Sequence, residues 1–213
     1  MTLLELKVIC IKNVSQDNET NFNTENYSDY SSDPRYADYI NNIDIAINQA
    51  LARLVTSEKI PSKIFRVNSS QITNDLQGYV KIDLSSLEPS VYRIKKVYFR
   101  THDGLLIHPM YSKPNADTLL VTKYSVDGEY EIVYSINIDY LQDNNIDLKD
   151  TFNIKDSLLN SFVVPFVKAK LWEAEEPNLA QQYMNYAESY LNAYDNDETN
   201  IEQPFVESAY SWF

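Results

Sequence analysis

The chain has 213 residues, of which 44% are hydrophobic, so it can bury one sizeable core or two small ones. This composition excludes a chain that is disordered throughout. The net charge of −13 argues against a simple nucleic-acid binder, which normally carries a basic excess. The single cysteine excludes a disulfide framework within one chain, and its apolar neighbours Val8, Ile9 and Ile11 predict that the Cys10 thiol is buried.

The charges are unevenly distributed along the chain. The segment from Lys59 to Lys123 contains ten Lys or Arg residues and five Asp or Glu residues, whereas the segment from Leu171 to Phe213 contains nine acidic residues and no basic one. Two interpretations fit this pattern. The two regions are independently solvated surfaces, or the acidic part of one subunit contacts the basic part of another.

Neither a leader sequence nor a membrane span is predicted. Glu5 and Lys7 interrupt the apolar N-terminus, and no cleavage site of small residues follows. The longest apolar stretch elsewhere, residues 162–167, contains Pro165 and is far shorter than the roughly 20 residues that span a bilayer. We therefore expect a soluble protein that makes no contact with a membrane.

The first third of the chain has helical periodicity. Residues 2–12 are compatible with a short amphipathic helix, although a strand also fits, and residues 13–32 are predicted to be a polar loop. Asp33 and Pro34 predict a helix start, with Asp33 as the cap and Pro34 at the first helical position. This helix is expected to extend to about Ser57, because one face is continuously apolar. The apolar residues are Tyr36, Tyr39, Ile40, Ile43, Ile47, Ala50, Leu51 and Leu54.

The middle of the chain changes to a period of two, which is typical of strands. The strands are predicted over residues 64–68, 79–84, 92–101, 105–110, 119–124 and 130–138. Asp103-Gly104 and Asp127-Gly128 predict tight hairpins between neighbouring strands. In the last strand, alternation places one set of residues on one face and a second set on the other. The first set is Tyr130, Ile132, Tyr134 and Ile136, and the second is Glu129, Glu131 and Ser135.

Helical periodicity returns over residues 156–195. Two successive helices are expected, with Pro165 kinking or starting the first and Pro177 starting the second. The chain contains seventeen tyrosines, several of them on these helices. This abundance fits either an aromatic core or surfaces that pack against partners. An acidic tail, residues 196–213, completes the chain.

Catalytic and metal-binding patterns are scarce. The histidines, His102 and His108, form no helical pair, and the three glycines are too scattered for a phosphate-binding loop. Each histidine is therefore predicted to be a strand or turn residue. Two acidic groups resemble metal or catalytic sites only weakly. Asp143, Asn145 and Asp147 match part of a calcium-binding loop, but are better explained as a polar connection that caps the next helix. Glu173, Glu175 and Glu176 form a carboxylate cluster that is better explained as a solvated helix end.

The order of the predicted elements resembles the head-to-tail adaptor, or connector, proteins of tailed bacteriophages. The residues that carry this resemblance are Asp33-Pro34-Arg35-Tyr36 through Ile43-Asp44-Ile45-Ala46-Ile47-Asn48-Gln49-Ala50-Leu51, then Leu158-Leu159, Phe166-Val167-Lys168-Ala169-Lys170-Leu171-Trp172, Ala180, and Tyr183 to Tyr194. None of these segments is a signature motif. The resemblance implies an α+β fold in which an α-helical bundle, the long helix plus two C-terminal helices, carries an inserted antiparallel β-rich domain and an extended C-terminal arm. The expected domains are residues 1–60 with 151–195 for the bundle, 61–150 for the β-rich domain and 196–213 for the arm.

The resemblance also implies a function. It predicts a structural virion protein at the head-tail interface, made in the host cytoplasm and assembled into a homo-oligomeric ring, dodecameric like the portal protein below which it docks. The ring would extend the channel through which DNA passes without sequence-specific binding, and would dock the next tail or ring protein. Family adaptors use an extended C-terminal segment to bind the portal, which assigns portal or neighbouring-ring contacts to the acidic and aromatic residues of the arm. These are Asp197, Glu198, Glu202, Phe205, Tyr210, Trp212 and Phe213.

No catalytic residue, metal or cofactor is expected. The alternative function is a carbohydrate- or protein-binding accessory module of a virion, built on the β-rich middle. A third possibility, an enzyme whose site is assembled across subunits, has little support from the residues.

Overall fold

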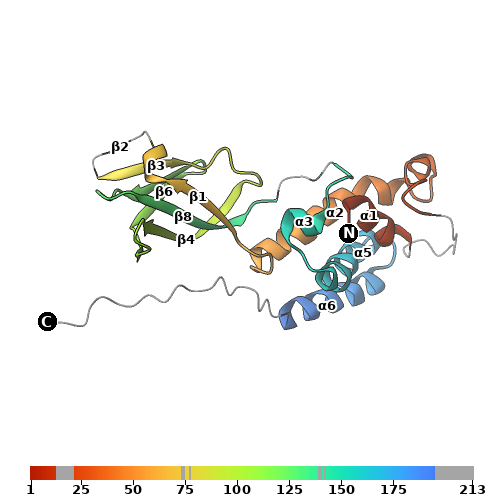
Figure 1. Ribbon diagram of the computed structural model, residues 1–213. Helices are drawn as coiled ribbons and strands as arrows, with labels where there is room; N and C mark the ends of the chain where they lie inside the picture. Colours follow the sequence, from red (N-terminus) through yellow and green to blue (C-terminus); the bar gives the residue numbers. More distant parts are fainter. Residues whose placement is uncertain (13–21, 73–74, 77, 139–140, 142, 195–213) are drawn as a thin grey trace. The chain divides into compact units, whose positions relative to one another are not determined.

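A computed structural model gives the fold, which is of the mixed α+β class, as predicted (Figure 1). It describes residues 1–12, 22–72, 75–76, 78–138, 141 and 143–194. The chain forms two compact units. Met1–Pro61 and Ile138–Asn196 make a helical unit, and Ser62–Asn137 makes a β unit between them in sequence. None of the helices within these residues is both long enough and apolar enough to cross a bilayer.

The helical unit is organised around α5 (Val164–Trp172), which packs against α1 (Leu3–Lys12), α2 (Ala37–Thr56) and α6 (Pro177–Ala193). Every residue of α5 except Lys170 is buried, as expected for a helix that is covered on all sides. The α2 and α6 helices are instead amphipathic and bury one face each. The shorter elements are η1 (Asp29–Ser32), α3 (Leu148–Phe152), α4 (Asp156–Leu158) and the π-helical η3 (Leu159–Val163).

The long helix begins three residues later than predicted. The backbone N–H groups of Tyr36 and Ala37 both donate to the carbonyl of Asp33, and the Asp33 carboxylate accepts from the N–H of Arg35. Asp33 therefore caps a turn that leads into α2, and the regular helix runs from Ala37 to Thr56. Asp33 and Pro34 therefore do not take the predicted cap and first position of the helix: the residue before the helix is Tyr36, which makes no side-chain cap, and Asp33 caps only the turn.

Pro165 lies near the start of α5, in the place where a kink or a helix start was predicted. Because proline has no N–H, it cannot donate to the carbonyl four residues earlier. The preceding segment, η3, widens into a π-helix, which accommodates the missing hydrogen bond within a helical path from Asp156 to Trp172. The second C-terminal helix starts at Pro177, as predicted.

An aromatic cluster orders part of the segment that was expected to be a polar loop. Phe22 is 2% exposed, and its ring stacks on that of Tyr36 at a centroid distance of 5.7 Å. Tyr30 contacts both rings edge-on, at 5.0 Å from Phe22 and 5.1 Å from Tyr36. The prediction of a polar loop rested on composition alone. It missed that a single buried side chain, Phe22, can pack this segment against the start of α2.

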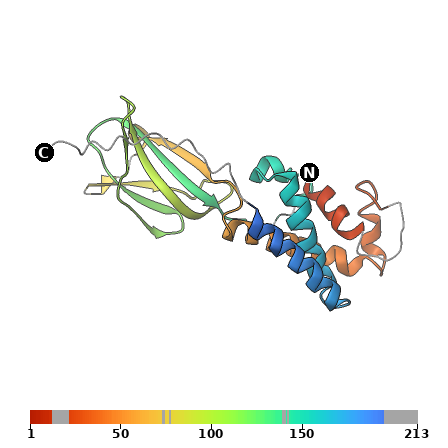
Figure 2. The ribbon, with the colours of Figure 1, turned by 90° about the horizontal axis from the view of Figure 1, so that it is seen from below.

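The β unit consists of two antiparallel four-stranded sheets that form two layers (Figures 1 and 2). In the first, the order is β1 (Lys63–Asn68), β8 (Gly128–Ile136), β4 (Val91–Thr101) and β5 (Leu106–Ile107). In the second, the order is β2 (Asp75–Leu76), β3 (Tyr79–Asp83), β7 (Thr118–Thr122) and β6 (Tyr111–Asn115). A short 3-10 turn, η2 (Ser69–Gln71), follows β1.

The core of the β unit lies between the two sheets. Phe99 of β4 packs on Tyr130 of β8 and on Tyr124, which follows β7. The Tyr130 hydroxyl donates to the carbonyl of Thr122 in the opposite sheet, so this buried phenol keeps a hydrogen bond. The inward face of β8 is the predicted set Tyr130, Ile132, Tyr134 and Ile136, all of which are buried.

The hairpin predicted at Asp127-Gly128 does not form. The strands on either side, β7 and β8, belong to different sheets, so the connection crosses from one layer to the other. Gly128 does not adopt a positive φ, whereas Gly104 in the β4–β5 turn does, with φ +86°. A Cβ at Gly128 would overlap the Arg100 carbonyl and the Phe99 ring, so close packing and not turn geometry requires glycine there.

The strand predicted over residues 105–110 is also shorter than expected. Only Leu106 and Ile107 pair with β4, and residues 108–110 carry the chain to the other sheet, where β6 begins at Tyr111. Pro109 has no N–H to continue the ladder, which agrees with the end of pairing at this position.

Candidate interaction surface

The outer face of the first sheet carries a connected set of charged side chains. Strand register places Arg66 of β1 opposite Glu131 of β8, and Glu129 opposite Arg100 of β4. Successive side chains of a strand point to opposite faces of its sheet. Because the neighbours of these four residues point into the core, the four charged side chains point outward.

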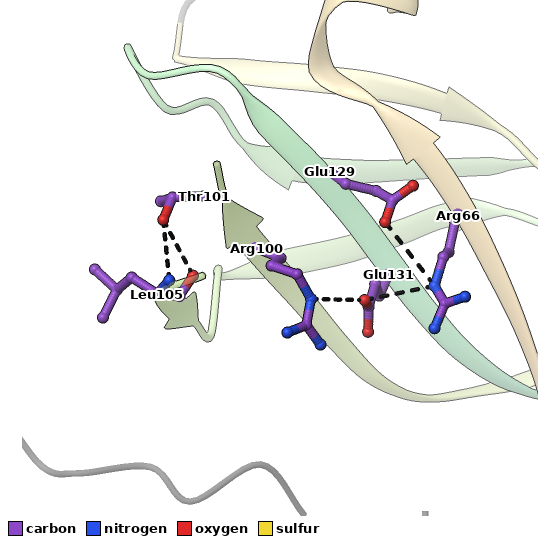
Figure 3. A network of polar contacts seen from close by, with 6 residues as sticks. All are labelled: Arg66, Arg100, Thr101, Leu105, Glu129 and Glu131. Atoms are coloured by element: carbon purple, nitrogen blue, oxygen red, sulfur yellow. Dashed lines mark hydrogen bonds and ion pairs between the residues drawn. The ribbon is translucent and has the colours of Figure 1, made fainter. Parts of the chain in front are cut away.

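These four residues form one connected network (Figure 3). Oε1 of Glu131 lies 2.9 Å from Nε of Arg100 and 3.4 Å from Nε of Arg66. Arg66 also lies 3.9 Å from Oε2 of Glu129. The Glu131 carboxylate therefore lies between two guanidinium groups that come from the strands on either side of β8.

Burial makes Glu131 the centre of the network. Its side chain is 10% exposed, whereas those of Arg66 and Arg100 are 55% and 40% exposed. A carboxylate withdrawn from water requires charged or hydrogen-bonding partners, and here two arginines supply them. The hydrogen bond from Arg100 to Glu131 raises the pKa of the Arg100 guanidinium, so this side chain stays charged. The arrangement fixes the orientation of both arginines on the sheet.

Two further cations extend this surface along β4. Arg93 is paired with Ser135 and Lys96 with Val133, so both lie on the outer face, and both are exposed. Next to Val133 on the other side, Ile64 of β1 is 38% exposed. We call the surface formed by Ile64, Arg66, Arg93, Lys96, Arg100, Glu129 and Glu131 the basic sheet face, because four cations outnumber two carboxylates.

A polar pocket of about 460 Å³ lies at one end of this face. It is bounded by the η2 turn, the end of β4 and the start of β8. Arg100 and His102 provide nitrogen donors, and Ser69 and Thr101 provide hydroxyl groups. Asp127 and Glu129 also line the pocket, and the Thr101 hydroxyl is already bonded to Leu105, so the set suits a hydroxylated ligand better than an acidic one. His102 lies in the β4–β5 turn, as predicted, and His108 lies between β5 and β6 against the Tyr98 ring.

The helical unit holds a second group of ionisable residues, but these are buried in its core. Lys7 of α1 lies 2.6 Å from Oδ1 of Asp44 on α2, and donates a hydrogen bond to Asn144. Cys10 is fully buried, as predicted, and burial raises the pKa of its thiol to about 12. Burial also lowers the pKa of Lys168, which lies over the Tyr183 ring. These groups join helices and are not displayed to a ligand.

The weak acidic patterns have structural roles. Asp147 caps α3 by accepting from the N–H of Lys149, which confirms the predicted capping role. Glu173 pairs with Lys170, and Glu175 accepts from the Tyr39 hydroxyl. In the described part of the chain, no group of three or more His, Cys, Asp or Glu side chains is arranged to hold a metal ion.

The contact residues predicted for the C-terminal arm lie outside the described residues. They are Asp197, Glu198, Glu202, Phe205, Tyr210, Trp212 and Phe213. The basic sheet face was not predicted from the sequence. In β4 and β8, charged residues alternate with apolar ones, which indicates an outer charged face. The alternation alone does not show which strands become neighbours in the sheet.

Comparison of the sequence with models of known protein families and with curated proteins found no match.

Proposed function

We propose that this protein is a head-to-tail adaptor of a tailed bacteriophage, a structural virion protein whose copies form a ring between portal and tail. The observation that carries the proposal is the insertion of an all-β unit, Ser62–Asn137, into a helical unit that is built from chain segments on both sides of it. This is the organisation that the resemblance implies for adaptors. A second observation supports the same organisation: the long helix, α2, packs on the C-terminal helical region.

In this proposal the two units have different tasks. The α2, α5 and α6 helices form the bundle that makes up the body of each subunit, and the β unit provides a platform for the next tail or ring protein. Residues 196–213 contact the portal or a neighbouring ring. The ring is a dodecamer, matching the portal, and no enzymatic activity or cofactor is involved.

The charge of the helical unit supports a passive DNA channel. Met1–Pro61 and Ile138–Asn196 together contain nineteen acidic and nine basic residues, a net charge of −10, whereas Ser62–Asn137 has a net charge of +1. A negative wall repels DNA phosphates, so a duplex could slide past without being retained.

Electron microscopy of the purified protein and of whole particles tests the proposal. We expect rings of the isolated protein, and density for this fold between the portal and the tail of the phage that encodes it. Immunogold labelling with antibodies to the β unit should mark the head-tail junction. A protein that stays monomeric at all concentrations and is missing from purified particles would contradict the adaptor function.

The polar pocket next to the basic sheet face favours one alternative, an accessory module that binds a carbohydrate or protein. Its hydroxyl and nitrogen groups suit a hydroxylated ligand. Binding on a glycan array that disappears in the His102→Ala variant would favour this alternative. Equal signals from both proteins, or none from either, would exclude the pocket as a glycan site.

A further inference from the structure

The C-terminal segment, residues 195–213, has a composition that demands a particular kind of partner surface. It contains five acidic residues and no basic one, and three of its last four residues are aromatic. A surface that binds it must supply cations together with exposed apolar area. The acidic residues are Asp195, Asp197, Glu198, Glu202 and Glu207, and the final aromatic residues are Tyr210, Trp212 and Phe213.

The helical unit of a second copy is a poor match for this segment. Its net charge is −10, so it repels a segment that carries five carboxylates. A pocket of about 230 Å³ between α2 and α5 has apolar lining from Ile45 and Leu171, but Glu173 also lines it and Lys170 is already paired with that residue. Shape alone would admit an aromatic side chain here, but charge disfavours it.

The basic sheet face has both properties. Arg66, Arg93, Lys96 and Arg100 outnumber its two carboxylates, and no ion pair to Lys96 forms within the described residues. Ile64 is 38% exposed beside Val133, in the same cross-strand row as Lys96. Cations therefore border an apolar position on the outer face of the sheet. The network with Glu131 holds Arg66 and Arg100 in place, which lowers the entropy lost on binding.

We propose that residues 195–213 of one copy bind the basic sheet face of a second copy. The carboxylates pair with the four cations, and an aromatic side chain packs on Ile64. This inference rests on the adaptor proposal and deepens it: the segment there assigned to the portal or a neighbouring ring is here assigned to a neighbouring subunit of the same ring. Because each copy has one acidic segment and one basic sheet face, the contact is heterologous and can be repeated around a closed ring.

Charge reversal in the full-length protein tests the contact. Lys96→Glu should weaken self-association at least about tenfold, measured as the concentration dependence of the sedimentation mass, because like charges oppose each other at the interface. The matched control is Lys81→Glu, since Lys81 is also an exposed strand lysine but lies on the second sheet. The control should associate within about twofold of the natural chain, and association should weaken as salt is raised.

A crosslinking experiment identifies the two surfaces directly. Trp212 is replaced by a photoreactive benzoylphenylalanine in full-length chains, and isotopically heavy and light preparations are mixed before irradiation. We expect crosslinks from residue 212 to β1 or β4, with heavy and light peptides joined. Crosslinks only between peptides of the same isotope would place the segment on its own chain, and crosslinks to α2, α5 or α6 would place it on the helical unit. Either result overturns the proposal.

The controls also separate this inference from the adaptor function. If rings form in both Lys96 and Lys81 variants with equal affinity, the contact is wrong while the adaptor proposal stands. If duplex DNA binds the natural chain at about 0.15 M salt and Lys96→Glu abolishes that binding, the basic sheet face is a nucleic-acid surface and the inference is wrong. Should the crosslinks appear in a protein that is missing from phage particles, the contact stands and the adaptor function fails.

Discussion

The Nζ atom of Lys7 on α1 lies 2.6 Å from Oδ1 of Asp44 on α2, in the interior of the helical unit. The side chains are 5% and 21% exposed, so Lys7 depends on this carboxylate, together with Asn144, to offset its loss of water. Residues far apart in the sequence thereby fix how α1 lies on α2.

Removing Asp44 should therefore be costly. Asp44→Ala leaves the Lys7 ammonium buried without its counter-ion, and we expect a loss of about 3 kcal/mol in the free energy of unfolding, measured by urea denaturation. Glu188→Ala is the control, because it removes the more exposed Arg53–Glu188 pair, which is worth at most about 1 kcal/mol. Equal losses in both variants would show that Lys7 regains water in the mutant and that the pair is not a structural link.

Leu51 tests the register of α2. Its side chain is fully buried, so Leu51→Ala should lower the stability by about 2–5 kcal/mol through lost burial and an unfilled cavity. Ile45 on the same helix is 52% exposed, and Ile45→Ala should change stability by no more than about 0.5 kcal/mol. Thermal unfolding of the two variants measures the contrast. A smaller loss for Leu51→Ala than for Ile45→Ala would mean that the buried face of α2 is wrong.

Periodicity in the sequence was sufficient to predict the long helices. The α2 and α6 helices bury one face each, so residues such as Leu51 and Leu191 recur at the helical spacing and mark that face. Strand positions in the middle of the chain were predicted for the same reason, since alternation marks the inward face of β8.

Strand order could not be predicted in this way. The Asp127-Gly128 pair has the composition of a hairpin turn, but the strands around it enter different sheets. Gly128 is required because its Cα passes close to Phe99 and Arg100, a contact between residues far apart in the sequence that no local pattern shows. The basic sheet face depends on that same strand order, because Arg66 and Arg100 meet at Glu131 only when β8 lies between β1 and β4.

Cys10 should make the fold sensitive to alkali. Burial raises the pKa of its thiol from 9.0 to about 12, so between these values the unfolded chain loses the proton and the folded chain keeps it. The contribution to stability is complete below pH 9 and falls as the pH rises, by about 1.4 kcal/mol per pH unit.

The comparison of natural protein with Cys10→Ala isolates this effect. Urea midpoints at pH 8 and pH 10 should fall more steeply for the natural chain. Lys168, whose pKa burial lowers, contributes the opposite slope, and burial raises the pKa of Tyr27. Both groups also interact electrostatically with Cys10, so the difference between the two profiles reports the Cys10 thiol together with these two couplings. Parallel pH profiles would mean that the Cys10 thiol is accessible to water in the folded protein.

Free duplex DNA should not bind tightly. The net charge of −13, with most of the excess on the helical unit, opposes the release of counterions that drives non-specific binding. In a mobility-shift assay at about 0.15 M salt we expect a Kd weaker than about 10 μM. Glu176→Lys should strengthen binding slightly, because this residue is exposed at the start of α6. Nanomolar binding by the natural chain would contradict a passive channel.

Deleting residues 196–213 should separate folding from assembly. The helices and strands described for the two units lie before residue 195, so the shortened chain should keep its circular dichroism spectrum and its urea midpoint. It should lose the carboxylates and aromatic side chains that we assign to portal or subunit contacts, and with them its ability to join its ring or portal in a reconstitution assay.

A chain of full length in which Asp197, Glu198 and Glu202 are changed to Asn or Gln serves as the control, since it retains the aromatic residues. We expect it to assemble only partially, and more poorly as salt is raised, because carboxylates chiefly accelerate encounter while aromatic side chains hold the contact. If the shortened chain enters particles as efficiently as the natural one, the C-terminal segment has no role in assembly.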